Sequence, residues 1–345
     1  MHVLIDIGHP AHVHLFRKAR DILIEHGHKA SVIARNKEVT HQLLDAYGIE
    51  FKSGSKIRAG WKRGLELFEW FMIVCMEIKK QNIDIVMSIG SPSASWAAKM
   101  CGINHLAFND TETAYIQRSL YSPASIKIFT PRCFLDDYGH KQIRYDGIHD
   151  LAYLRPEHFI PDPTVKKDIG VSEHEEYVIL RFVSWDAVHD WGYKKTSSNI
   201  KHEIVKILAE KYSVFISAEG KLPRDLDKYR LKLPPHRLHD GMAFAAAVIS
   251  DGATTATEAA VLGRPSLYIS IEKFLNRLGC IQFLSNDYKL LDTIDIKDYT
   301  PECVMNFLDQ PRLDERMSER NRLINNTVDV AAYIAYRCEE YGERG

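Results

Sequence analysis

The chain has 345 residues, of which 45% are hydrophobic and 26% are charged, and these ordinary globular values exclude a disordered or fibrous protein. Lys and Arg number 45 against 46 Asp and Glu, and this balance excludes a protein whose main work is coating nucleic acid, which would carry a clear basic excess. At about 150 residues per domain, the length predicts two domains.

The cysteines and the first residues indicate a cellular compartment. The 6 cysteines include no CxxC pair, which argues against a disulfide scaffold or a structural zinc site and favours a reducing cytoplasm. The first ten residues lack the pattern of a signal peptide, and no stretch approaches the roughly 20 apolar residues that span a bilayer. We expect a cytoplasmic protein, with peripheral contact at the inner face of the cell membrane as an open alternative.

The first half of the chain alternates short apolar runs with helical patterns. Strands are expected at 3–7, 30–34, 83–89 and 105–108. Fully apolar strands between amphipathic helices are typical of a parallel sheet that is covered on both faces. The first half is therefore predicted to be a doubly wound α/β domain.

Three prolines in eight residues break this pattern at 156–163, which makes that segment the best candidate for a linker. The alternation then starts again, with strands expected at 177–183, 214–218, 248–250 and 266–270. Apolar residues at helical spacing from Leu313 predict one or two closing helices. The prediction is two Rossmann-like α/β domains facing a cleft, 1–160 and 161–312, with closing helices over 313–345.

Ligands of parallel α/β sheets bind at the carboxyl ends of the strands. Gly8, His9 and His12 follow the first strand, and His14 comes soon after. A histidine there can act as a general base near neutral pH, so we expect His12 to be catalytic and Gly8 and His9 to bind substrate. Helix capping and a metal site remain as alternatives. The metal site is disfavoured because residues two apart on a helix point away from each other.

The most specific stretch of the sequence is 248–270, where strand, glycine turn, helix and strand follow in compact order. Gly252 lets the chain approach a ligand closely. Thr254 and Thr255 offer hydroxyl and N–H groups at a helix start, where the helix dipole favours a phosphate. Glu258 lies one turn further on and fits a ribose diol. Thr255-x-x-Glu258 is equally a capping box, which needs no ligand.

The segment 251–265, DGATTATEAAVLGRP, resembles the donor site of GT-B glycosyltransferases. It looks most like the family that adds N-acetylglucosamine to the lipid-linked peptidoglycan precursor. In that family the glutamate of this pattern binds the ribose of the nucleotide sugar, a role that the resemblance gives to Glu258. His12 stands where the family has a histidine after its first strand. His9-Pro10-Ala11, however, replaces the glycine-rich segment that precedes this histidine in the family.

Over nearly its full length the chain is similar to a prokaryotic family of predicted GT-B glycosyltransferases, with matching segments at 109–114, 145–154 and 181–190. This resemblance implies a nucleotide-sugar donor such as a UDP-sugar, and a glycan or lipid-linked acceptor of the cell envelope. It implies no cofactor, no metal and no nucleic acid. The alternatives are a non-hydrolysing UDP-sugar 2-epimerase, which shares the architecture, and a non-catalytic protein that binds sugar nucleotides.

Other turns contribute further candidates. Asp110 and Glu112 are carboxylates expected at a sheet edge, and we expect them to assist an acid–base step, with helix capping as the alternative. Ser184 and Arg181 are expected to contact the donor diphosphate, against a purely structural loop. His239 resembles a position that contacts the nucleotide. In the expected mechanism His12 or a neighbouring carboxylate accepts the acceptor's proton, while helix N-termini and threonine hydroxyls stabilise the departing diphosphate.

The segment 64–80 is densely apolar and follows several basic residues. Such a helix can lie on an anionic membrane and reach a lipid-linked acceptor. Glu66, Glu69, Glu77 and Lys80 share one narrow stripe at helical spacing, which we interpret as a single solvent-exposed edge. That interpretation favours a helix in the core or between the domains over a membrane-bound one.

Overall fold

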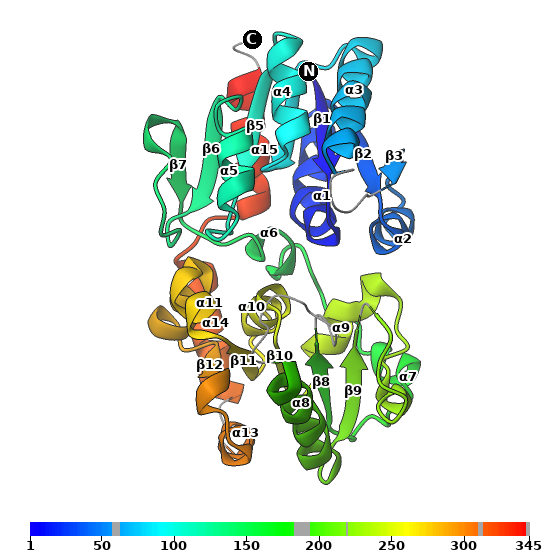
Figure 1. The fold of residues 1–345 in the computed structure, drawn as a ribbon, viewed down its shortest axis with the longest axis vertical. Helices are drawn as coiled ribbons and strands as arrows, with labels where there is room; N and C mark the ends of the chain where they lie inside the picture. Colours follow the sequence, from blue (N-terminus) through cyan, green and yellow to red (C-terminus); the bar gives the residue numbers. More distant parts are fainter. Residues whose placement is uncertain (57–62, 183–193, 219, 310–312, 343–345) are drawn as a thin grey trace. The chain divides into compact units, whose positions relative to one another are not determined.

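A computed structural model of the chain describes residues 1–56, 63–182, 194–218, 220–309 and 313–342. The chain divides into two compact units, each of which holds one parallel sheet (Figure 1). The first unit comprises Met1–Phe159 and Asn326–Gly345, and the second comprises Ile160–Asn325.

The first unit is built on a seven-stranded sheet in the order β3-β2-β1-β4-β5-β6-β7, in which every pair of neighbours is parallel. The chain first adds β2 and β3 on one side of β1. It then reverses direction and adds β4 to β7 on the other side, so the strand order reverses between β1 and β4. The strands are β1 (His2–Ile7), β2 (Lys29–Asn36), β3 (Lys52–Lys56), β4 (Ile85–Ile89), β5 (Asn104–Phe108), β6 (Lys127–Pro131) and β7 (Gln142–Tyr145).

Helices cover both faces of this sheet. One layer contains α1, α2, α6 and α15, and the other contains α3, α4 and α5 (Figure 1). This double cover explains why the central strands consist of apolar residues, for example Val3, Leu4 and Ile5, which are fully buried. The helices are α1 (Pro10–Glu25), α2 (Glu38–Ala46), α3 (Arg63–Gln81), α4 (Pro92–Met100), α5 (Tyr115–Tyr121), α6 (Leu151–Leu154) and α15 (Val330–Gly342).

Helix α3 is oriented differently from the sequence-based expectation. Glu66 and Glu77 are each 2% exposed, so the stripe that they share is not a solvent-exposed edge. Arg35 Nη1 lies 2.9 Å from Glu66 Oε1, and Lys52 pairs with Glu77, so both buried charges have partners. The exposed face of α3 is apolar instead, and its side chains are 44 to 62% exposed: Leu65, Phe68, Met72 and Met76.

Trp70 attaches α3 to the sheet. Its side chain is fully buried, and its Nε1 donates a hydrogen bond to Asp6 Oδ1 at 3.0 Å. Burial raises the pKa of Asp6 above its ordinary value, in spite of the opposing charge of Arg35. On the edge strand β3, a Cβ atom added to Gly54 would lie 1.5 Å from Trp70 Cζ3. Strand β3 therefore comes so close to the indole ring that no side chain fits at position 54.

The second unit is built on a five-stranded sheet in the order β12-β11-β10-β8-β9, again with every pair parallel. Here β8 lies between β9 and β10, so the strand order of this sheet reverses between β8 and β10, as that of the first sheet does between β1 and β4. The strands are β8 (Tyr177–Arg181), β9 (Ser213–Ser217), β10 (Ala247–Ser250), β11 (Ser266–Ser270) and β12 (Asp292–Asp295).

The helices of the second unit surround this sheet, and α8 supplies Ile204, Val205 and Leu208 to its core. They are α7 (Val165–Asp168), α8 (Lys194–Ala209), α9 (Leu238–Ala243), α10 (Ala253–Val261), α11 (Glu272–Arg277), α12 (Gly279–Gln282), α13 (Pro301–Leu308) and α14 (Leu313–Asn325).

The last two helices belong to different units. In the second unit, Arg320 of α14 donates from Nε to the carbonyl of Val261 at 2.9 Å. In the first unit, Asn104 donates from Nδ2 to the carbonyl of Tyr341 in α15 at 2.9 Å. Figure 1 shows α15, in red, among the elements of the first sheet. The closing helices predicted over 313–345 are thus divided between the units, α14 in the second and α15 in the first.

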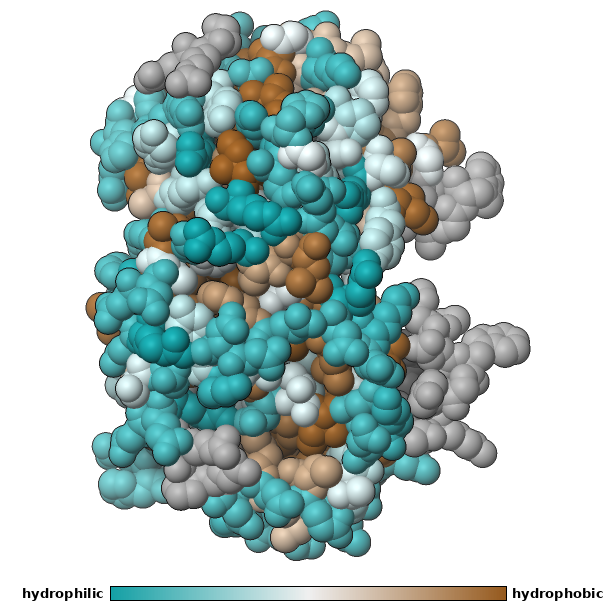
Figure 2. Space-filling view, turned by 90° about the vertical axis from the view of Figure 1, so that its left-hand side faces the viewer, coloured by the Kyte–Doolittle hydropathy of each residue, from teal (hydrophilic) through white to brown (hydrophobic). Residues whose placement is uncertain are grey.

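Within the described ranges, no helix is both long enough and apolar enough to cross a membrane. Figure 2 shows one face of the molecule, on which hydrophilic residues predominate and hydrophobic residues form small groups.

We expect Gly54→Ala to lower the free energy of unfolding by about 3 kcal/mol, because the added methyl group would overlap the buried Trp70 ring. Gly64→Ala is the matched control. A Cβ atom there meets nothing within 4 Å, and alanine favours the helix by up to about 1 kcal/mol. Urea titrations of both variants measure the effect. Equal stability of the two variants would contradict the close approach of β3 to the ring.

Candidate functional site

Each sheet has a reversal point at which ligands of doubly wound folds bind, beyond the carboxyl ends of two neighbouring strands. In the first sheet these strands are β1 and β4, and in the second they are β8 and β10. The candidates from the sequence that the structure describes lie at the carboxyl ends of strands, or in the loops and helices that follow them.

His12 lies in the first turn of α1, directly after β1. The backbone N–H of Gly8 donates a hydrogen bond to His12 Nδ1 at 3.1 Å. Burial, followed by the neighbouring rings of His9 and His149, holds the pKa of His12 well below its ordinary value. The ring is therefore neutral at pH 7. Because Nδ1 accepts the Gly8 hydrogen bond, the single ring hydrogen is on Nε2.

His9 has a different local role. It is the N-cap residue of α1, and its Nδ1 accepts a hydrogen bond from the N–H of Ala11 at 3.3 Å. A capping side chain satisfies one of the N–H groups that a helix start leaves without a partner. Its ring centroid lies 6.0 Å from that of His12.

Asp110 and His149 form a pair at the same edge of the first sheet. Asp110 follows β5, His149 follows β7, and His149 Nδ1 lies 3.0 Å from Asp110 Oδ2. Although burial raises the pKa of Asp110, the charge of His149 and hydrogen bonds from His149 and Thr111 lower it below its ordinary value. Both groups act on the pKa of His12, which His149 lowers and Asp110 raises, and we refer to these three side chains together as a cluster.

His149 is a residue that the sequence analysis did not single out. The sequence offered one indication of its role. His149 lies in the segment 145–154, which carries part of the family resemblance, two residues before the short helix α6. Nothing local marks this histidine, because its partner Asp110 lies 39 positions earlier in the chain and reaches it through the sheet.

Glu112 makes a contact of another kind. Its side chain is buried, and Oε1 accepts a hydrogen bond from the N–H of Leu135 at 3.1 Å. This carboxylate therefore binds the backbone of the loop between β6 and β7.

In the second unit the structure brings together His239 of α9 and Glu258 of α10. His239 Nε2 lies 3.0 Å from Glu258 Oε1, and each residue is 5% exposed. The capping box suggested by Thr255 and Glu258 does not form, because the N-cap of α10 is Gly252 and no side chain caps the helix. Glu258 points into the unit and contacts His239 instead.

The turn between β10 and α10 is tightly held. Ser250 Oγ accepts from the N–H of Gly252 and donates to its carbonyl, both at 2.9 Å. Thr254 is exposed in the first turn of α10, whereas Thr255 is buried. On the adjacent strand, Arg181 donates from Nη1 to Ser217 Oγ at 3.1 Å, so its guanidinium lies toward β9. Ser184 and the rest of the segment 184–190 lie outside the described residues.

Lys201 is a second residue that the sequence analysis missed. It is buried on α8, and its Nζ lies 2.7 Å from Oδ2 of Asp251, at the start of the glycine turn. The sequence could have indicated it, because this lysine lies within the apolar stripe formed by Ile200, Ile204 and Val205. A lysine on the buried side of a helix requires a partner, and Asp251 is that partner.

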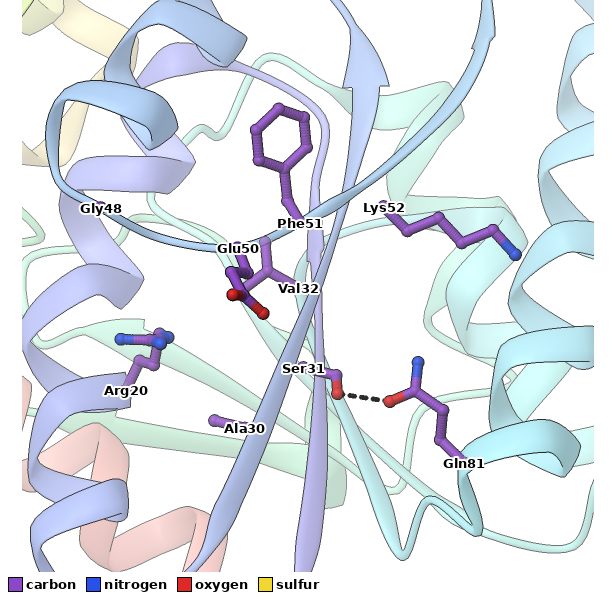
Figure 3. A pocket seen from close by; sticks show the side chains of 9 residues that line it. All are labelled: Arg20, Ala30, Ser31, Val32, Gly48, Glu50, Phe51, Lys52 and Gln81. Carbon is purple, nitrogen blue, oxygen red and sulfur yellow. Dashed lines mark hydrogen bonds between the residues drawn. The ribbon is translucent and has the colours of Figure 1, made fainter.

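A hollow of about 550 Å³ lies elsewhere on the first unit (Figure 3). It is lined by Ala30 and Ser31 near the start of β2 and by Gln81 at the end of α3, and Ser31 bonds to Gln81. These residues belong to the amino ends of the strands, and none of the candidates lines the hollow. Among the described residues, no group of three or more His, Cys, Asp or Glu is arranged to hold a metal ion.

Comparison with known proteins places the chain in a family. A family model described as "Protein of unknown function (DUF354)" matches residues 1–334. The chain belongs to the DUF354 family. No curated protein matches its sequence.

Solved structures resemble this DUF354 protein over nearly their whole length. A UDP-GlcNAc 2-epimerase from Neisseria meningitidis bound to UDP-GlcNAc has a TM-score of 0.69 at 14% identity, covering 99% of this chain and 100% of that chain. The glycosyltransferase VinC in complex with dTDP has a TM-score of 0.63 at 12% identity, covering 100% of both chains. MurG from Acinetobacter baumannii has a TM-score of 0.59 at 14% identity, covering 98% of this chain and 99% of that chain.

These likenesses, together with the two parallel sheets, show that the DUF354 protein has the GT-B fold with two Rossmann-like units. The predicted fold class and the predicted resemblance are both confirmed.

Proposed function

We propose that the protein is a glycosyltransferase that moves a sugar from a nucleotide-diphosphate sugar to a glycan or lipid-linked acceptor of the cell envelope. The observation that carries this proposal is the reversal point of the second sheet. There a tight Gly252 turn leads into the N-terminus of α10, next to the buried pair His239 and Glu258.

The second unit is the donor side in this proposal. The free N–H groups of a helix start and the helix dipole favour a diphosphate, and Thr254 and Thr255 add hydroxyl groups in the first turn of α10. Arg181 and Ser184 are assigned to the same diphosphate. Glu258 is assigned to the ribose, because a carboxylate accepts hydrogen bonds from hydroxyl groups such as those of a ribose diol.

The first unit is the acceptor side. We assign acid–base chemistry to the cluster that contains His12 and Asp110 and to Glu112, which lies two residues after Asp110. Gly8 and His9 are assigned to substrate contacts. The departing diphosphate carries the charge that develops in the reaction. Helix N-termini and hydroxyl groups stabilise that charge, so the proposal includes no metal and no cofactor.

The ligands of two similar structures support a nucleotide-sugar donor. One epimerase holds UDP-GlcNAc, and one glycosyltransferase holds dTDP. We propose a UDP-sugar as the first donor to test.

We expect one member of a panel of UDP-, dTDP-, GDP- and ADP-sugars to raise the melting temperature, because a ligand that binds the folded state stabilises it. Glu258→Gln should weaken the binding of that ligand by roughly 10-fold or more, as expected for the loss of a charged hydrogen-bond acceptor. Glu272→Gln is the matched control, since Glu272 lies on the same unit in an exposed pair with Lys297. Equal affinity in the wild type and Glu258→Gln would contradict the ribose assignment.

A transferase and an epimerase differ in what they do to the donor alone. We expect no conversion of UDP-GlcNAc to its 2-epimer when the protein is incubated without an acceptor, because the proposed reaction breaks the bond to the diphosphate and leaves C2 untouched. Proton NMR of the nucleotide sugar measures the outcome. Accumulation of the 2-epimer would replace the proposed transferase with an isomerase.

We also propose that the first unit contacts a membrane, in agreement with a lipid-linked acceptor. The support is the exposed apolar face of α3, which includes Phe68 and Met72, together with exposed Lys79 and Lys80 at the end of the helix. Trp96 of the adjacent α4 is also partly exposed. Apolar side chains beside lysines are typical of surfaces that rest on anionic lipids.

We expect the protein to sediment with vesicles of phosphatidylglycerol more strongly than with vesicles of phosphatidylcholine, because only the former attract the lysines. The double variant Phe68→Ser, Met72→Ser should bind at least about 10-fold more weakly, since each side chain buried in lipid contributes about 1.5–3 kcal/mol. Met305→Ser on α13 is the control, because Met305 is equally exposed on the second unit. The same loss in all variants would contradict a specific role for α3.

A further inference from the structure

The His149 ring has a polar partner at one nitrogen and none among the described residues at the other. His149 is 7% exposed, and its Nδ1 contacts Asp110. Its Nε2 atom is buried and has no hydrogen-bond partner among the described residues. The ring of Tyr145 lies nearly parallel to it, with an interplanar angle of 7° and centroids 6.5 Å apart. Buried polar atoms almost always have partners, so a lone Nε2 at the carboxyl edge of a sheet indicates a place for a ligand atom.

The partners of the two histidines give them opposite tautomers. An ionised carboxylate can only accept hydrogen bonds, so in the neutral form of His149 the Asp110 contact places the ring hydrogen on Nδ1 and leaves a lone pair on Nε2. A backbone N–H can only donate, so the Gly8 contact places the lone pair of His12 on Nδ1 and the hydrogen on Nε2. At Nε2, His149 is therefore a base and His12 is a donor.

The two carboxylate candidates of the first unit, Asp110 and Glu112, already accept hydrogen bonds or contact a histidine. Asp110 accepts from Thr111 Oγ1 at 3.1 Å through Oδ1 and contacts His149 through Oδ2. Glu112 accepts from the backbone of Leu135. The nitrogen His149 Nε2 is the group in this cluster that is both basic and without a partner among the described residues.

We propose that His149 is the catalytic base of the glycosyl transfer, that Asp110 is its positioning residue and that His12 is a hydrogen-bond donor to the acceptor. This inference rests on the proposed function. The acceptor O–H bond breaks and its proton goes to His149 Nε2, while the oxygen forms a bond to C1 of the sugar. The bond between C1 and the diphosphate oxygen breaks, and the electron pair leaves with the nucleotide diphosphate. Solvent water then takes the proton from the imidazolium.

The tautomers can be measured without any substrate. In long-range ¹H–¹⁵N correlation spectra of the full-length protein with ¹⁵N-labelled histidine at neutral pH, we expect His149 as the Nδ1–H form and His12 as the Nε2–H form. The variants His149→Gln and His12→Gln assign the signals. Asp110→Asn should move His149 toward the Nε2–H form, because an amide can present its NH₂ group to Nδ1. A wild-type His149 that carries its hydrogen on Nε2 would overturn the proposal.

Turnover provides the second measurement. With UDP-GlcNAc as donor and water as acceptor, we expect His149→Gln to lower the rate constant of UDP release by about 100-fold or more with little change in KM, as for the loss of a general base. His28→Gln is the matched control, since His28 lies 3.2 Å from Glu339 in another histidine–carboxylate pair of the first unit, and it should keep the wild-type rate.

The outcomes separate this inference from the proposed function. A wild-type protein that binds and consumes UDP-GlcNAc, with an unchanged rate in His149→Gln, overturns the role of His149 and leaves the transferase in place. A wild-type protein that is stabilised by no nucleotide sugar overturns the proposed function, and the base role falls with it. Unfolding of His149→Gln does not remove the test, because the tautomer of His149 is read in the wild-type protein and Asp110→Asn, which should move the His149 signal, then identifies it.

Discussion

The parallel pairing of the strands is the constraint on which the rest of this structure depends. Because the strands of that sheet are all parallel, every strand ends at the same edge, and each connection must run back along the sheet, in most cases as a helix. Residues that are far apart in the sequence then meet. His12, Asp110 and His149 follow three different strands and reach one another for this reason alone. The second sheet repeats the arrangement around β8 and brings His239 to Glu258.

The same constraint explains which strands could be predicted from the sequence. Central strands are covered on both faces and need continuous apolar runs, so β1 and β11 are recognisable by composition. The edge strands β3 (KSGSK) and β12 (DTID) pair on one side and carry polar residues, so no apolar run marks them. Gly54 looks like a strand breaker in β3, although its purpose is to make room for Trp70 from another element.

Charged residues caused the other differences from the sequence-based expectation. Helical periodicity assigns a stripe of glutamates to solvent, but Arg35 and Lys52 lie on strands under α3 and neutralise Glu66 and Glu77 there. Lys201 is the reverse case. This lysine lies within the apolar stripe of α8, and its charge is paired with Asp251, which follows β10. A buried charge is tolerated when a partner is within reach, and periodicity carries no information about partners on other elements.

The candidate site shows the same limit at the level of single atoms. The turns that hold the candidates follow from the positions of the strands, but the role of each histidine depends on which group faces its Nδ1. For His12 that group is a backbone N–H, which has no other protonation state. For His149 it is a carboxylate whose pKa is below its ordinary value, although burial opposes this, so the group stays ionised at neutral pH. Both tautomers are thus set by groups whose charge does not change near neutral pH, and two neighbouring histidines acquire opposite chemistry at one sheet edge.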